Sequence, residues 1–110
     1  MKIYILDSFH TEAIKHFITT HMPSYEVVDN IESADVCMLS AKMILYREVH
    51  VPYNKKIIAM STLEELLSKL ADRSYALLDK NSLVKYAHGN LSDSLIKAIK
   101  KDLIEILTTI

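Results

Sequence analysis

Short runs of aliphatic residues that stop abruptly at a polar residue constrain the fold of this chain more than any other feature. The first run, Ile3–Leu6, ends at Asp7-Ser8. Four consecutive β-favouring or aliphatic residues fit a strand that is covered on both faces, and the polar pair then fits the carboxyl edge of that strand. Four later segments are also interpreted as strands: Tyr25–Val28, Asp35–Ser40, Ile57–Met60 and Tyr75–Leu78.

Helical patterns occupy several of the segments between these strands. Apolar residues at helical spacing predict a helix from about Phe9 to His21, which Ser8 can cap. Ser61-Thr62-Leu63-Glu64 has the pattern of a capping box and predicts a helix that ends at Asp72-Arg73. The last segment, Leu91–Ile110, carries a broad apolar stripe opposite charged residues, which predicts a long amphipathic helix.

Two segments leave alternatives open. Ala41–His50 fits either an irregular helix or a surface loop, and Val51-Pro52 ends it in both cases. Asn81 or Ser82 can cap a short helix that runs to His88, with Gly89 as its left-handed C-terminal residue. The competing interpretation is a hairpin in which Leu83–Ala87 returns as an antiparallel strand.

The alternation of strand and helix predicts an α/β fold with a mostly parallel sheet and helices on both faces. No repeat, low-complexity segment or linker interrupts the chain, so we expect residues 1–110 to form one domain. For five strands of this length we expect the order 2-1-3-4-5, which is the flavodoxin-like arrangement. Its ligand crevice lies at the carboxyl ends of strands one and three.

The composition excludes several classes of protein. The chain has 110 residues, 50% of them hydrophobic, and a formal net charge of -1, which argues against disorder and against a polyanionic partner. Gly89 is the only glycine, so neither a Rossmann glycine turn nor a P-loop is present. A nucleic-acid surface would need a local patch, for which Lys97, Lys100 and Lys101 are the only dense candidates.

The single cysteine and the hydropathy pattern bear on location. Cys37 lies within an apolar segment, which suits a small buried hydrophobe, and it has no partner for an intramolecular disulfide. No apolar run reaches the roughly 18 residues that cross a bilayer, and a strand begins too early for a signal peptide. We therefore expect a cytoplasmic protein without a membrane partner.

The predicted topology gathers polar residues at one edge of the sheet. Because parallel strands end at the same edge, the residues expected there are Asp7, Ser8, Ser40, Ser61, Thr62 and Lys80. We take these as a candidate ligand-binding site. Each also has a structural interpretation: Asp7 can cap the first helix, Ser61 can cap a later one, and Lys80 can be a solvated turn residue.

In this arrangement the chain resembles the receiver domains of two-component response regulators. The motif of that family is an acid after strand one, a phosphoaccepting Asp after strand three, Ser or Thr after strand four and Lys after strand five. Asp7, Ser61 and Lys80 occupy three of these places, whereas Ser40 stands where the phosphoaccepting aspartate would be. The resemblance therefore implies a degenerate receiver that no longer takes phosphate.

Two local resemblances point to other families. Met1–Asp7 with the following helix, and Asp35–Ile58, look like the N-terminal flavodoxin-like part of D-2-hydroxyacid dehydrogenases. The nucleotide-binding domain of that family has no counterpart here, so neither its activity nor its cofactor is carried over. Lys2-Ile3-Tyr4 and Glu32–Val36 are similar to nucleoside deoxyribosyltransferase-like domains, which place acids in a cleft at this edge.

Metal binding and catalytic triads find no support in the order of residues. His10, His16 and His21 are spaced so that they do not share one helical face, and we expect no metal site and no cofactor. A triad is recognised by geometry and cannot be argued from the sequence alone.

We expect a non-catalytic regulatory or protein-interaction module. The apolar stripe of the last helix exceeds what a lid over one sheet face needs, so we expect a protein partner or a homodimer through that helix. The alternative is a small nucleotide- or phosphosugar-processing enzyme. In that enzyme Asp7 would act as general acid or base, and Ser40 and Lys80 would orient an anionic ligand.

Overall fold

The computed structural model describes residues 1–71 and 73–110 and contains alternating strands and helices. The strands are β1 (Lys2–Leu6), β2 (Glu26–Val28), β3 (Val36–Ser40), β4 (Lys56–Ser61) and β5 (Ala76–Asp79). The helices are α1 (Thr11–His21), α2 (Ala41–Leu45), α3 (Glu64–Leu70), α4 (Asn81–Ala87) and α5 (Asp93–Thr109). Each predicted strand is present, with bounds that differ by one residue at one or both ends from the expected ones.

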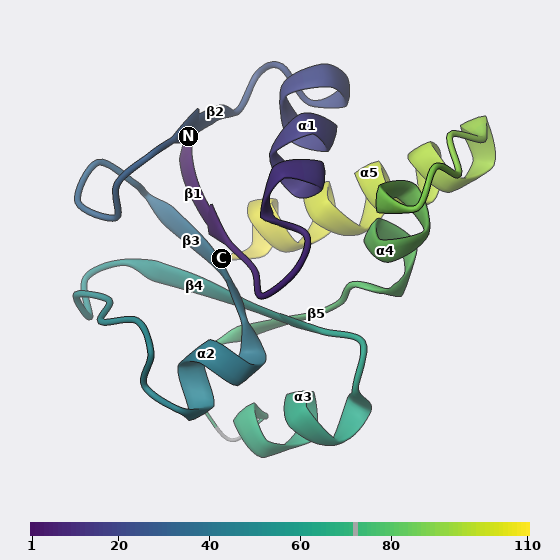
Figure 1. The fold of residues 1–110 in the computed structure, drawn as a ribbon. Coiled ribbons are helices and arrows are strands. Elements are labelled where there is room, and N and C mark those ends of the chain that lie inside the picture. Colours follow the sequence, from purple (N-terminus) through teal and green to yellow (C-terminus); the bar gives the residue numbers. More distant parts are fainter. Residues whose placement is uncertain (72) are drawn as a thin grey trace.

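The sheet has the predicted topology. Its strand order is β2-β1-β3-β4-β5 and every neighbouring pair is parallel, which is the flavodoxin-like arrangement (Figure 1). Leu6 pairs with Leu39 in the register of β1 and β3, so Asp7 and Ser40 follow at neighbouring strand ends. The α/β fold class and the order 2-1-3-4-5 are confirmed, and all the hydrophilic strand ends lie at one edge.

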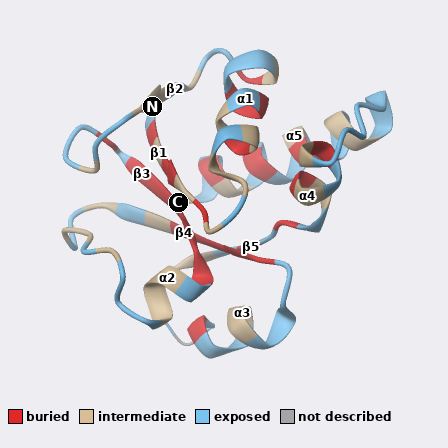
Figure 2. Cartoon of the chain, viewed as in Figure 1, coloured by how far each residue is buried: buried red, intermediate tan, exposed pale blue. Residues whose placement is uncertain are grey.

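The larger of the two core layers lies between the sheet and the helices α1, α4 and α5 (Figure 1). Its fully buried side chains include Phe17 of α1 and Leu103 of α5, packed with Ile3, Met38 and other strand residues. Figure 2 shows that β3 is buried, together with most of β4. All residues of β3 are buried, as expected for a central strand of a parallel sheet.

The opposite face of the sheet is covered by the short helices α2 and α3 (Figure 1). Here Cys37, Leu39 and Ala59 are buried beneath residues of α2, α3 and the loop that follows α2. No helix occurs between β2 and β3 in the described chain, because residues 29–35 are too few for a crossover helix. Ile31 of the connecting segment packs on this part of the face.

The ambiguous segments are resolved by the structure. Residues 83–87 belong to helix α4, so the antiparallel hairpin is wrong; Leu83 and Tyr86 are buried in the core, which a solvent-facing return strand would not allow. Gly89 follows the helix with φ of 99°, the left-handed conformation that was predicted. In Ala41–His50 only the first half is helical, as α2.

The predicted helix starts need two corrections. Ser8 does not cap α1, whose N-cap is His10; the Asp7 carboxylate accepts the free backbone N–H groups of that turn instead. Ser61 accepts the backbone N–H of Leu63, but α3 begins at Glu64 with Leu63 as its N-cap, so the reciprocal capping box does not form. The predicted helix end at Asp72 lies outside the described residues.

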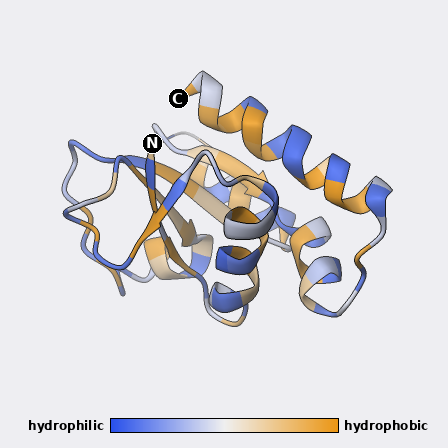
Figure 3. Ribbon diagram, turned by 90° about the horizontal axis from the view of Figure 1, so that it is seen from above, coloured by the Kyte–Doolittle hydropathy of each residue, from blue (hydrophilic) through white to orange (hydrophobic). Residues whose placement is uncertain are grey.

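The long C-terminal helix is present, from Asp93 to Thr109, and it is amphipathic. Viewed from above, hydrophobic and hydrophilic patches recur along it (Figure 3). Most of its apolar stripe is used internally, since Ile99, Leu103 and Leu107 are buried, and Ile104 is the large apolar residue of α5 that stays exposed, at 42%.

Cys37 is fully buried, as predicted for a small hydrophobe. Burial raises the pKa of its thiol, against the opposing effect of the Lys55 charge. Among the described helices none is long and apolar enough to cross a bilayer. No cluster of three or more His, Cys, Asp or Glu side chains with metal-binding geometry occurs in residues 1–71 and 73–110.

Candidate functional site

The candidate site is built around Asp7, which directly follows β1 and has a fully buried side chain. Lys80, which follows β5, donates to Asp7 Oδ1 at 2.6 Å. The backbone N–H groups of Phe9 and His10 donate to Oδ2 at 3.2 and 3.0 Å. Thr11 completes the turn by exchanging hydrogen bonds with the backbone of Asp7. Both carboxylate oxygens are therefore engaged by groups of the chain itself.

These contacts set the ionisation of Asp7. Burial disfavours the charged carboxylate and by itself would raise the pKa, but the hydrogen bonds from Lys80, Phe9 and His10 outweigh it. The pKa of Asp7 consequently lies below its ordinary value of 3.8. At neutral pH the side chain of Asp7 is therefore an ionised carboxylate.

This pairing predicts a pH dependence of stability. Because the folded pKa is lower than the unfolded one, the contribution of Asp7 is present above about pH 4 and is lost as pH falls through the folded pKa. Asp7→Asn removes that contribution. Urea denaturation at a series of pH values measures the difference in the free energy of unfolding between wild type and variant. We expect this difference to shrink in acid by at most about 1.4 kcal/mol per pH unit. A difference in the free energy of unfolding that stays constant down to about pH 2 would contradict a lowered pKa of Asp7 in the folded protein.

The serine hydroxyls at this edge are also engaged by other groups of the chain. Ser8 Oγ lies 3.1 Å from Ser40 Oγ, so the ends of β1 and β3 are joined by a hydrogen bond. Ser61 Oγ accepts the N–H of Leu63 at 2.9 Å. Ser40 and Ser61 are 5% and 6% exposed, and among the predicted site residues Thr62 is the exposed one. The predicted residues do converge on one edge.

A hollow of about 230 Å³ lies beside this polar network. Every predicted site residue except Asp7, which is covered, lines it, together with aliphatic side chains. Phe9 and Leu63, 84% and 54% exposed, are large apolar residues at this hollow. The additional lining residues that the sequence did not single out are Phe9, His10, Lys42, Met60, Leu63, Leu66 and Val84.

His10 is the most notable residue that the sequence analysis missed as part of the site. Its Nδ1 is buried, has no hydrogen-bond partner among the described residues, and lies 3.5 Å from Asp7 Oδ2. His88 lies nearby, with ring centroids 5.7 Å apart. The spacing from Asp7 to His10 would have indicated this proximity only if the turn before α1 had been placed correctly.

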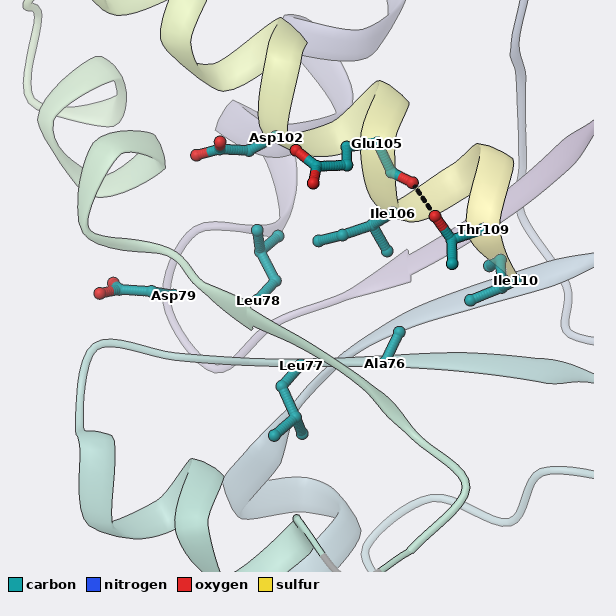
Figure 4. Close-up of a pocket in the computed structure, with 9 residues that line it drawn as sticks. All are labelled: Ala76, Leu77, Leu78, Asp79, Asp102, Glu105, Ile106, Thr109 and Ile110. Carbon is teal, nitrogen blue, oxygen red and sulfur yellow. Dashed lines mark hydrogen bonds between the residues drawn. The ribbon is translucent and has the colours of Figure 1, made fainter.

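A second hollow, of about 370 Å³, lies between α5 and the outer strand β5 (Figure 4). Leu78 points from β5 toward α5, whereas Leu77 points to the other side of the sheet (Figure 4). The floor is aliphatic, and the carboxylates around it are those of Asp79, Asp102 and Glu105. No lysine or arginine lines this groove in the described chain.

Comparisons with protein-family models, with curated proteins and with solved structures found no match to this chain.

Proposed function

We propose that the protein is a non-catalytic regulatory or protein-interaction module that resembles a degenerate receiver domain. The observation that carries the proposal is the engagement of Asp7: one carboxylate oxygen binds Lys80 and the other binds two backbone N–H groups. A carboxylate that holds Mg²⁺ or moves a proton needs at least one oxygen available to the ligand. Here the pair instead ties the end of β1 to the end of β5.

The resemblance to receivers supports a regulatory role without phosphate transfer. Asp7 follows β1, Ser61 is the last residue of β4 and Lys80 follows β5, in the order of the receiver motif. The position of the phosphoacceptor, at the end of β3, is held by Ser40, whose hydroxyl forms a hydrogen bond with that of Ser8. A serine hydroxyl without an activating base is a poor phosphoacceptor.

The groove between β5 and α5 is the surface that we propose for the partner. β5 is an outer strand of the sheet, so in the part of the chain that the structure describes its outer backbone groups pair with no other strand. An aliphatic floor flanked by Asp79, Asp102 and Glu105 favours a partner segment with aliphatic and basic side chains. One wall of this groove is the C-terminal helix α5, through which the sequence analysis expected a partner to bind.

Charge reversal in the groove tests this proposal. We expect Asp102→Lys/Glu105→Lys to remove a partner that the wild-type chain captures from cells of its source, because like charges would then oppose basic groups of that partner. The control is Glu26→Lys/Glu32→Lys, which makes the same change at exposed positions around β2, the opposite edge of the sheet. Quantitative mass spectrometry of the captured proteins is the measurement.

The capture experiment distinguishes a partner bound in the groove from proteins bound elsewhere. A protein depleted about tenfold by the groove variant and retained by the control supports the proposal, and identical capture by all three chains overturns it. Gel filtration with light scattering asks whether a second copy is the partner. A dimer of the 12.6 kDa chain that the groove variant alone converts to monomer would make the interaction homotypic.

A small-molecule enzyme is the second candidate, and His10 favours it. A histidine beside a buried carboxylate and on the wall of a hollow of about 230 Å³ is the arrangement of an oriented general base. The substrate class would be a nucleotide or sugar phosphate held near Ser40 and Lys80. A melting-temperature shift with such a ligand that His10→Gln abolishes would favour this candidate over the interaction module.

A further inference from the structure

Both arginines of the chain line a hollow near the amino ends of β4 and β5, away from the site described above. Arg47 lies in the loop after α2, and Arg73 lies shortly before β5. They line the hollow, of about 280 Å³, together with His50. Its apolar wall consists of Leu39, Ile44, Val49, Val51 and Ile57, with Tyr75 as the aromatic member.

A second basic hollow, of about 410 Å³, adjoins the first, because Val51, Ile57 and Tyr75 line both. Lys55, Lys56 and the fully exposed Tyr53 lie around it, together with Asn54 and Ser74. Lys55 is held in place by the carbonyls of Glu32 and Ala34, each at 2.8 Å. No Asp or Glu among the described residues lines either hollow. Positive charge and aromatic surface thus occur together here.

The position of Arg47 is fixed by an unusual backbone. Its φ is 54°, and no other described non-glycine residue has a positive φ. A left-handed conformation is sterically costly for a residue with a Cβ atom, and glycine would adopt it more readily. The turn is closed by the N–H of Arg47 to Ile44 and of Glu48 to Met43, so the arginine follows α2 at a defined place.

Neither guanidinium group is paired with a carboxylate among the described residues, which leaves both able to bind an external anion. Among the described residues, the ion pairs with N···O within 4.0 Å involve Asp7, His10, Glu12, Lys15, Asp29 and Lys80, and neither arginine. A planar guanidinium binds phosphate oxygens in pairs, and it is the preferred side chain for phosphate recognition. Tyrosine faces beside such charges bind planar rings by stacking.

We propose that this pair of hollows binds a nucleoside phosphate. The phosphate groups lie on Arg47, Arg73 and His50, and the base packs against the tyrosine and aliphatic surface. The size of the hollows fits one small ligand, since ligand pockets commonly have volumes of about 300 to 1,000 Å³. The lysines of α5 lie on the helix layer of the other sheet face, so they do not extend this basic region into a track for a polynucleotide.

The experiment is a calorimetric titration of the whole chain with ADP at low ionic strength. We expect binding of one ADP, weakened about tenfold or more by Arg47→Gln and by Arg73→Gln, because each removes a charged hydrogen-bond donor to phosphate. Tyr53→Ala, at an exposed site, should weaken ADP binding while leaving the affinity for inorganic phosphate unchanged. Lys97→Gln/Lys101→Gln is the matched control on α5, and it should change the affinity by less than about twofold.

Several results would overturn the proposal. One is the absence of ADP binding at about 1 mM, and another is an equal loss of ADP affinity in the α5 control. A third is ADP binding that only His10→Gln abolishes, which would place the ligand at the carboxyl edge of the sheet. Binding of a single-stranded oligonucleotide without binding of ADP would replace a small ligand with a nucleic acid. Unchanged melting temperatures of the arginine variants without ligand separate a binding defect from a folding defect.

Discussion

Lys80→Met is expected to lower the free energy of unfolding by about 3 kcal/mol, because it leaves the fully buried carboxylate of Asp7 without its compensating charge. The aliphatic length of methionine retains most of the packing, so the effect reports the ion pair. Urea denaturation followed by circular dichroism measures it. The double variant Asp7→Asn/Lys80→Met should lose about 1 to 2 kcal/mol less than the sum of the losses in the two single variants, because neither remaining side chain is charged.

Lys42→Met is the matched control for this prediction. Lys42 lines the same hollow but is exposed, and its replacement should change the stability by less than about 0.5 kcal/mol. Equal effects of the two lysine variants, or strict additivity in the double variant, would show that the bond between Asp7 and Lys80 does not hold the strand ends together.

Leu103→Ala on α5 is expected to cost about 3 kcal/mol, because Leu103 is fully buried between α5 and the sheet and its loss leaves a cavity. Its neighbour Ile104 is 42% exposed, and Ile104→Ala should cost less than about 1 kcal/mol. Thermal and urea unfolding of the two variants give the comparison. Similar losses at both positions would mean that α5 presents a different face to the sheet.

The fold was largely predictable because its signals are local. A central strand of a parallel sheet is covered on both faces, so β3 appears in the sequence as an apolar run that ends at Ser40, and all of its residues are buried. The stripe of α5 likewise follows from helical periodicity. The bounds of helices were less predictable: Asp7, rather than Ser8, binds the N–H groups before α1, and which oxygen reaches them depends on the turn geometry.

The position of the candidate site could be predicted from the sequence, but the pairing of its side chains could not. That polar residues gather at the carboxyl edge follows from parallel strands, and the structure places Asp7 and Ser40 at neighbouring strand ends. The hydrogen bond between Ser8 and Ser40 was not predicted. The bond between Asp7 and Lys80 joins residues 73 positions apart, from strands with β3 and β4 between them. A long side chain that crosses two strands leaves no trace in local patterns, so Lys80 could equally have been a solvated turn residue.

The hollow lined by the two arginines was even less predictable from the sequence. Arg47 and Arg73 belong to different loops and have no shared sequence motif, and they line one hollow only because β4 and β5 are neighbours. The general expectation for open α/β sheets directs attention to the carboxyl edge. A basic hollow near the amino ends of the strands is therefore found only in three dimensions.

The central claim is that the polar groups at the carboxyl edge hold the fold and accept no phosphoryl group. Heteronuclear NMR of the chain titrated with about 10 mM Mg²⁺ and acetyl phosphate, with intact mass measured in parallel, tests it most directly. We predict unchanged amide resonances at Asp7, Ser8, Ser40 and Ser61 and no added phosphoryl mass. Saturable shifts at these residues that Asp7→Asn abolishes, or a phosphoryl group on Ser40, would contradict the claim.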